Sequence, residues 1–358
     1  MAPTTSIREV AARAGVSVGT VSNVLNRPDL VTPSTRERVQ SAISDLGFVR
    51  NESARQLRLG RSRTIGLVVL DVANPFFTDV ARGAEDAANE AGVAVILCNS
   101  DESPRKEAAY LDVLEEQRVR GVLISPVRGL RSRVAQLRER GIPVVLVDRR
   151  ASRRDQCSVS VDDVLGGDIA VTHLLEQGHE RIGYICGPFT IRQDRDRHIG
   201  ALRALDRAGR KPADLVVLEG GGLNVASGRE QTRCLLDLPD PPRAVFCAND
   251  LLALGALQEA VRGGVRVPDD LAIVGYDDIE FAAAAAVPLT SVRQPRHELG
   301  ATAARLLIEE ADQPDDHVHQ RLVFEPSLVV RESSGGDTSG AARTPHPGTA
   351  RRSRRTPR

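Results

Sequence analysis

From residue 64 onward, short runs of β-branched residues alternate with longer amphipathic segments, and this alternation constrains the fold more than any other feature. One series of runs reads TIGLVVLD, VAVILCNS, GVLISPV and IPVVLVDR, and a second reads RIGYICGP, DLVVLEG, AVFCAND and LAIVGYDD. Helical segments such as FTDVARGAEDAANEAG separate them. Such βαβ units build parallel sheets. We therefore expect two doubly wound α/β lobes, with the chain crossing between them near Asp162 and again between Pro288 and Pro295.

The size and composition of the chain fit a globular protein with more than one core. The chain has 358 residues, of which 41% are hydrophobic, which is too many residues for one ordinary core. No run approaches the roughly 18 apolar residues of a membrane span, and charges stand where a signal peptide would have its apolar core. We expect a cytoplasmic protein with no membrane partner.

The cysteines are odd in number, scattered along the chain and mostly inside apolar runs, so we expect reduced core thiols rather than disulfides or zinc ligands. They are Cys98, Cys157, Cys186, Cys234 and Cys247.

Short helices with clear start and stop signals are predicted in the first fifty residues. Ser6 and Glu9 form a capping box that opens a helix, and Gly15 ends it. Ser17 can cap a second helix over about residues 18–26. A third helix opens at the sequence TPST, with Thr32 as its cap and proline in its first turn, and closes at Gly47.

The spacing of these helices is that of a helix-turn-helix. Ala11 is small where two helices would cross, Gly15 suits a turn with positive φ, and Val21 would pack the second helix on the first. The outer face of the second helix carries short side chains and hydrogen-bonding groups, as a helix in the DNA major groove requires. The alternative is an ordinary three-helix subdomain. Residues 1–63 hold ten arginines against five acidic residues, which favours DNA. The predicted contacts are Ser17, Val18, Gly19, Thr20, Ser22, Asn23 and Asn26.

Several long motifs resemble the LacI/GalR family of bacterial transcriptional regulators. The headpiece string IREVAARAGVSVGTVSNVLN is similar to that of the family, and the resemblance continues through NPFF, VSVDD, CANDLLALGAL and VGYDDIEFAAAAAVPLTSVRQP. It covers nearly all of residues 5–332. One departure is Asn23, where many members carry arginine, so the operator sequence does not follow from the resemblance. The resemblance implies a homodimer or higher oligomer, double-stranded operator DNA and a small-molecule effector, with no cofactor.

The segment NESARQLRLGRS between headpiece and core is predicted to form a short hinge helix. Asn51 can cap it, and Ala54 and Leu57 share one side. A helix this short is marginal in water, so it should order only when something packs on it. The resemblance implies that two such helices meet in the minor groove, where Leu57 wedges between base pairs. The arginines of this segment, with Arg63, would contact phosphates. The alternative is a plain interdomain linker whose Leu57 covers the core.

Polar residues at the predicted strand ends are the candidate ligand shell, because ligands of doubly wound sheets bind at the carboxyl ends of strands. Such residues accept and donate to sugar hydroxyls, and Arg197 adds a fork of donors. The resemblance places the effector contacts at Phe76 or Phe77, Asp148, Arg197, Asn249 and Asp277. The alternative for each acidic residue is a helix cap or turn former, and we expect that role for Asp250 and Asp278.

These features together predict a regulator with four parts. They are a headpiece at 1–50, a hinge helix and linker at 51–63, a two-lobed effector-binding and dimerisation core at 64–332, and a disordered basic tail at 333–358. The expected function is repression of carbohydrate uptake or catabolism genes under control of a sugar-like effector. Whether the effector releases DNA or promotes binding stays open.

The alternatives are two other classes of protein. A periplasmic sugar-binding protein would need an export signal and would have no use for the headpiece. An enzyme would need a catalytic constellation, and none stands at plausible spacing. The HVH sequence at residues 317–319 is expected to be an exposed strand pair rather than a metal site.

Overall fold

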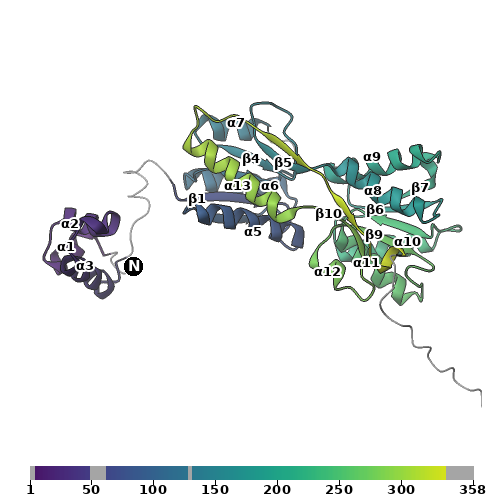
Figure 1. The fold of residues 1–358 in the computed structure, drawn as a ribbon, viewed down its shortest axis with the longest axis horizontal. Helices are drawn as coiled ribbons and strands as arrows, with labels where there is room; N and C mark the ends of the chain where they lie inside the picture. Colours follow the sequence, from purple (N-terminus) through teal and green to yellow (C-terminus); the bar gives the residue numbers. More distant parts are fainter. Residues whose placement is uncertain (1–4, 49–61, 128–130, 336–358) are drawn as a thin grey trace, which may run out of the picture. The chain divides into compact units, whose positions relative to one another are not determined.

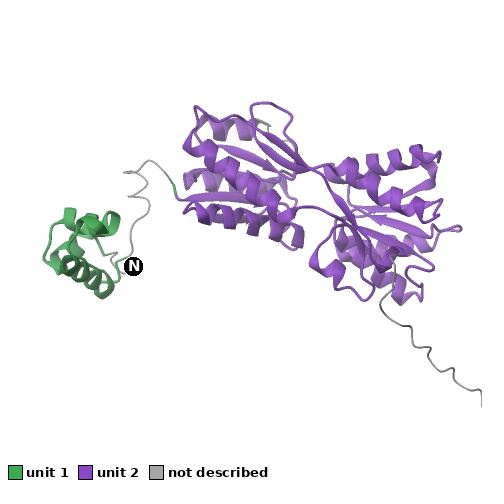
Figure 2. Ribbon diagram, viewed as in Figure 1, with its two compact units in different colours: residues 1–62 green, residues 63–358 purple. Residues whose placement is uncertain are grey.

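The structure is a computed structural model that describes residues 5–48, 62–127 and 131–335. The chain divides into two compact units, residues 1–62 and residues 63–358 (Figure 2). Among the described residues, no helix is long and apolar enough to cross a membrane.

The first unit contains the three predicted helices. They are α1 (Ile7–Ala14), α2 (Val18–Asn26) and α3 (Pro33–Asp45), with a short 3-10 helix, η1 (Pro28–Leu30), after α2. The capping box of Ser6 and Glu9 is present, Gly15 ends α1 at φ 64°, and the Ser17 side chain accepts from the backbone of α2. The core of this unit is centred on Val10, Val21 and Val39, all fully buried. These details confirm the predicted helix-turn-helix.

The start of α3 differs from expectation. Thr32 occupies the N-cap position but makes no capping hydrogen bond with its side chain. Its hydroxyl donates to that of Thr35 instead, at 3.0 Å. Pro33 at the first helical position already fixes φ and has no N–H to satisfy, so the helix begins there without a side-chain cap.

The N-lobe is built on one six-stranded sheet in the order β11-β5-β4-β3-β1-β2, with all pairs parallel. Along β1, Ile65, Leu67 and Val69 pack with α5 and α13 on one face, whereas Val68 belongs to the cluster on the other face, with α6. The elements are β1 (Thr64–Val69), α5 (Pro75–Glu90), β2 (Ala94–Asn99), α6 (Pro104–Glu116), β3 (Val122–Ile124), α7 (Arg131–Glu139), β4 (Val144–Val147), β5 (Ser158–Val161), α13 (Arg296–Asp312) and β11 (Arg321–Phe324).

The C-lobe repeats this plan on a second six-stranded sheet, in the order β12-β10-β9-β8-β6-β7. Only β12 runs antiparallel to its neighbour. The elements are α8 (Asp163–Glu176), β6 (Ile182–Cys186), α9 (Arg192–Arg207), η2 (Pro212–Asp214), β7 (Leu215–Glu219), α10 (Val225–Leu236), β8 (Ala244–Cys247), α11 (Asp250–Arg262), β9 (Ala272–Asp277), α12 (Glu280–Ala283), β10 (Thr290–Arg293), β12 (Ser327–Val329) and η3 (Glu332–Ser334).

Three segments connect the lobes, one more than predicted (Figure 1). The first crossing follows β5 at Asp162, and the second lies between β10 and α13 at Gln294 and Pro295, as expected. The third follows β11, which pairs with β5 in the N-lobe, and leads to β12, which pairs with β10 in the C-lobe. The segment between these two short strands is only Glu325 and Pro326.

Pairs of helices cross closely in both lobes because glycines face one another. A Cβ at Gly300 of α13 would overlap the backbone carbonyl of Val80 in α5, and one at Gly83 of α5 would overlap that of His297. The same reciprocal arrangement joins α8 to α9 and α10 to α11, through Gly167, Gly200, Gly228 and Gly255. The absence of side chains at these points lets helix backbones touch, so each pair packs as one unit.

Both predicted boundaries of the core require correction. Arg63 was expected to contact phosphate, but its guanidinium donates to the carbonyl of Gly92 in the second unit at 3.0–3.1 Å. At the other end, Ser333 and Ser334 are buried, and the Ser333 hydroxyl donates to the carbonyl of Ile273 on β9. The ordered core therefore reaches Gly335. The rest of the predicted tail lies outside the described residues.

Candidate ligand cleft and candidate nucleic-acid interface

A polar cleft lies at the carboxyl ends of strands from both lobes. About 40 Å³ of this cleft is open to the centre of a water molecule. All six residues that the sequence predicts for the effector line it, three from each lobe. They are Phe76, Phe77 and Asp148 of the N-lobe and Arg197, Asn249 and Asp277 of the C-lobe.

Arg197 is held rigidly at the floor of the cleft. It lies in the second turn of α9 and is only 4% exposed. Its Nε donates to Asp163 at 2.8 Å, and its Nη1 donates to the carbonyl of Ala248 at 2.6 Å. The guanidinium also stacks over the ring of Tyr276, 3.7 Å from the centroid. These contacts orient the remaining donors of Arg197, and they give the residue a structural role that the sequence did not predict.

Two buried carboxyl groups of the cleft titrate far from their ordinary range. Burial raises the pKa of Asp277 to about 6, against the opposing effect of Arg197. Burial and the nearby Asp163 raise the pKa of Asp148 to about 8. Both residues have positive φ; Asp148 directly follows β4, and Asp277 is the last residue of β9. Strained backbone and unfavourable charge burial at one place are features of binding sites rather than of stable cores.

Asn249 has the alternative role of a helix cap, and its position keeps the predicted role open. Its side-chain oxygen accepts from Leu252 N at the start of α11, and its amide donates to the carbonyl of Leu223. It is therefore a helix cap that also lines the cleft. Phe76 and Phe77 follow Asn74 and Pro75 at the start of α5, and their rings meet edge to face at 4.9 Å. They form an apolar wall beside the carboxylates.

Sequence reasoning missed part of the lining. The other lining residues are Leu70, Asp71, Asn74, Glu102, Ile191, Gln193, Leu223 and Gln294. Asp71 stands near the end of β1, so the rule that selected Asp148 also points to it. Gln193 and Gln294 carried no such signal, yet their amides donate to the carboxylates of Asp148 and Asp277 at 2.8 and 2.7 Å.

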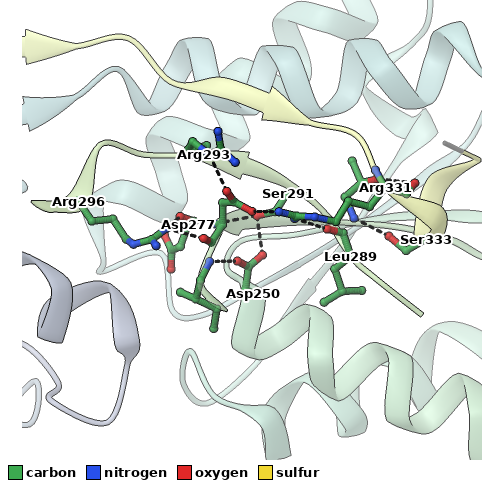
Figure 3. A network of polar contacts seen from close by, with 11 residues as sticks. Asp250, Asp277, Leu289, Ser291, Arg293, Arg296, Arg331 and Ser333 are labelled. Carbon is green, nitrogen blue, oxygen red and sulfur yellow. Dashed lines mark hydrogen bonds and ion pairs between the residues drawn. The ribbon is translucent and has the colours of Figure 1, made fainter. Parts of the chain in front are cut away.

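Asp250 lies in a polar network of the C-lobe with Ser291, Arg293 and Arg331 (Figure 3), and neither Asp250 nor Asp278 lines the cleft. Asp250 accepts from the Ser291 hydroxyl at 2.7 Å and from Ile279 N at 2.9 Å. Asp278 pairs with Arg293 and Arg331 at 2.6 and 2.7 Å. Because Arg331 follows β12, this network fastens the last strand to the rest of the C-lobe.

The α2 helix presents the face predicted to meet DNA. Val21 and Val24 point into the core of the first unit, whereas Val18, Gly19 and Asn23 are exposed and Thr20 and Ser22 are half-buried. The side chains at the ends of α2 also stabilise it, because Ser17 contacts Thr20 and the Asn26 amide donates to the carbonyl of Ser22 at 2.8 Å. The predicted hinge contacts Asn51, Ala54 and Leu57 lie outside the described residues.

The prediction for the HVH sequence was wrong. These residues lie in a loop between α13 and β11, not in a strand. The His317 side chain is only 1% exposed, and its Nε2 lies 3.1 Å from the Cys157 sulfur. The fold therefore brings a cysteine to these histidines from 160 residues away in sequence.

Comparisons with known proteins agree with this architecture. Residues 6–51 match the model for bacterial regulatory proteins of the lacI family, and residues 171–334 match a periplasmic binding protein-like domain. The transcriptional repressor PurR of Photobacterium profundum is 34% identical over 333 residues, which are 92% of this chain and 98% of the relative. The chain belongs to the lacI family. The ribose operon repressor of Escherichia coli K12, another relative of this family member, is also 34% identical, over 92% of this chain and 99% of its own.

Solved structures of regulators resemble the family member along most of its length. The lac repressor dimer bound to operator and an anti-inducer matches with a TM-score of 0.81 at 28% identity, covering 93% of this chain and 99% of the repressor. The complex of the transcriptional regulator CelR with cellobiose matches with a TM-score of 0.69 at 36% identity, covering 92% and 100%. The fold predicted from the sequence, a helix-turn-helix headpiece with a two-lobed α/β core, is confirmed.

Proposed function

We propose that this lacI-family protein is a transcriptional repressor that binds operator DNA through α2 and responds to an uncharged sugar-like effector in the cleft. The observation that carries the proposal is the cleft itself, in which a fixed arginine fork and several carboxyl groups surround an apolar wall. Fixed donors and acceptors beside an aromatic wall suit a molecule with many hydroxyls and an apolar ring face. The similar proteins named above are repressors or regulators by name, which supports a regulatory binding function.

The charges of the lining favour a neutral ligand. Four lining residues carry carboxyl groups and only Arg197 carries a guanidinium. Burial and the nearby Asp71 also raise the pKa of Glu102, so this wall already resists negative charge. A phosphorylated sugar would bring further anionic charge beside these carboxyl groups, and Arg197 is already paired with Asp163. Solved regulators of similar fold carry neutral sugars in their names, cellobiose in one and ribose in another.

The repressor is proposed to act as a homodimer. A single headpiece reads one half-site, and pairing two of them gives the symmetry of a palindromic operator. The edge strand β2 of the N-lobe exposes Ile96 and Leu97, and neighbouring α6 exposes Val113. An apolar edge of this kind calls for a covering partner, and a second copy supplies one. Effector closing the cleft would shift the N-lobes of the two copies relative to each other and so alter DNA binding.

The test pairs calorimetry with operator titration. The ligand panel contains neutral mono- and disaccharides and their phosphates, and the DNA is the region upstream of the repressor's own gene. Arg197→Lys keeps a charge for Asp163 but loses the planar fork. Arg207→Lys, on the exposed side of the same helix, is the matched control. We expect Arg197→Lys alone to lose effector binding while both variants keep operator affinity.

The two halves of the proposal fail separately. Binding of phosphorylated sugars in preference to neutral ones would overturn the assigned ligand class. Unchanged effector affinity in Arg197→Lys would overturn the assigned site. A chain that binds the sugar but shows no salt-sensitive affinity for its upstream DNA would not be a repressor of its own operon.

A further inference from the structure

We propose that Cys157, Glu310, His317 and His319 form a zinc site in the N-lobe, separate from the ligand cleft. Cys157 directly precedes β5, Glu310 lies in the last turns of α13, and both histidines lie in the loop before β11. One thiolate, two imidazoles and one carboxylate make a donor set that zinc takes in proteins. The four potential ligand atoms all lie within 4.8 Å of one another.

The distances between these atoms fit a tetrahedral ion. The Cys157 sulfur lies 3.1 Å from His317 Nε2 and 3.6 Å from His319 Nδ1. Glu310 Oε2 lies 3.9 Å from each of the same two nitrogens. Zinc bonds of about 2.0–2.3 Å separate the ligand atoms of a tetrahedron by about 3.3–3.7 Å. The four distances given above therefore lie within about 0.6 Å of the tetrahedral values, and the other two lie within 4.8 Å.

Without a metal ion, the polar atoms of this cluster do not all have a hydrogen-bond partner. Glu310 Oε2 is buried and has no hydrogen-bond partner among the described residues, and at 3.9 Å from the imidazoles it is beyond hydrogen-bond reach. A divalent ion would neutralise a thiolate and a carboxylate together and give Glu310 Oε2 a ligand.

The surrounding groups orient two of the ligands. Glu309 Oε1 lies 3.3 Å from His317 Nδ1, so the outer nitrogen faces a carboxylate and Nε2 faces the cluster. Metal-bound histidines commonly have such a partner. The backbone N–H of Gln320 donates to the Cys157 sulfur at 3.3 Å, which favours the thiolate.

One contact must change when metal binds. Arg138 Nη2 lies 3.0 Å from His319 Nε2, and a metal on Nδ1 requires Nε2 to keep its proton. Arg138 then leaves Nε2 and retains Asp155, whose backbone carbonyl it also contacts. Arg138→Gln removes this competing cation and should tighten zinc binding.

The site would tie together three segments at the amino-terminal end of the N-lobe sheet. All strands of this sheet are parallel, so the cluster lies at the end opposite to the cleft, where β1 also begins. Bound zinc would fix the approach to β11 and hence the third lobe crossing. The inference stands apart from the proposed repressor function, because it concerns no residue of the cleft or of α2.

Zinc content and cobalt spectroscopy test the proposal on the full-length chain, purified without a histidine tag. We expect about one zinc per chain and, after exchange for cobalt, the intense visible bands of a tetrahedral ion with a thiolate charge-transfer band. His319→Ala and Cys157→Ser should lower zinc affinity at least 100-fold, and Glu309→Gln about 10- to 100-fold. Cys234→Ser, at an exposed cysteine, is the control and should change nothing.

Three results would overturn the zinc site. They are no zinc above background, equal zinc affinity in His319→Ala and wild type, and a cobalt spectrum without thiolate character. Because the His319 side chain is 20% exposed and Glu309 51% exposed, their variants should fold even where Cys157→Ser does not. Circular dichroism of each variant checks this.

Discussion

Asp277 offers the sharpest test of the idea that the cleft sacrifices stability for binding. Its carboxyl group is 3% exposed, and burial raises its pKa from 3.8 to about 6. The folded state therefore prefers the protonated acid. Each pKa unit corresponds to about 1.4 kcal/mol, so ionised Asp277 destabilises the folded chain by about 3 kcal/mol above its folded pKa. This cost shrinks as pH falls through about 6 and is nearly gone below about pH 4.

Asp277→Asn should remove that cost with little structural change. Asparagine keeps the side-chain oxygen that accepts from Gln294 at 2.7 Å, and it tolerates the positive φ of 106° at this position. We expect the ligand-free variant to be more stable than wild type by up to about 3 kcal/mol near pH 7.5, and by only about 0.5 kcal/mol near pH 4. Its affinity for the effector should fall about 10- to 1,000-fold, because a charged acceptor is lost.

The neighbouring aspartate is the matched control. Asp278 also has positive φ, but its carboxylate is paired with Arg293 and Arg331 and does not line the cleft. Asp278→Asn should destabilise the chain by about 1–3 kcal/mol and leave effector affinity unchanged. Urea unfolding at both pH values measures the stabilities. A loss of stability in Asp277→Asn near neutral pH, or a gain that does not shrink on acidification, would refute the reasoning.

Three further predictions concern DNA binding and packing. The logarithm of operator affinity should fall linearly with the logarithm of salt concentration and lose orders of magnitude between about 50 and 200 mM; a flat response would argue against phosphate contacts. Leu57→Ala should cost a few kcal/mol of specific operator affinity, with nonspecific affinity and effector binding unchanged; unchanged operator affinity would make the hinge a simple tether. Gly300→Ala should destabilise the N-lobe by about 1–3 kcal/mol or more, because the new Cβ would overlap the carbonyl of Val80; a wild-type melting temperature would show that α5 and α13 separate easily.

The strong periodic segments of the sequence predicted most of the fold. Each of the eight apolar runs quoted from the two βα series forms a strand. The strands that were not predicted, β5, β10, β11 and β12, are only three or four residues long. The predicted strands β3, β4 and β8 are as short but entirely apolar, whereas strands such as SVSV and RLVF contain polar residues and are hard to distinguish from loops. The third crossing between β11 and β12 therefore had no visible signal.

The sequence predicted those residues of the candidate site that are polar and stand at the end of an apolar strand. Asp148 and Asp277 directly follow apolar runs, so their place in the cleft follows from the rule for doubly wound sheets. Gln193 sits in a helix among charged residues and looks like a surface side chain until the lobes bring it to Asp148. The same limitation hid the partner of the HVH sequence, because Cys157 lies 160 residues away from His317.

The three crossings also dictate when each lobe is finished during synthesis. The sequence of the C-lobe from α8 to β10 is inserted between the first five strands of the N-lobe and its α13 and β11. The N-lobe therefore cannot complete its sheet until nearly all of the C-lobe sequence has been synthesised. At that point the C-lobe itself still lacks β12 and η3. Because domains tend to fold as units while the chain emerges, both lobes stay incomplete until residues 296–334 appear. Messages truncated anywhere before that segment would yield two unfinished sheets with open edges, a ready substrate for proteases rather than a partly active regulator.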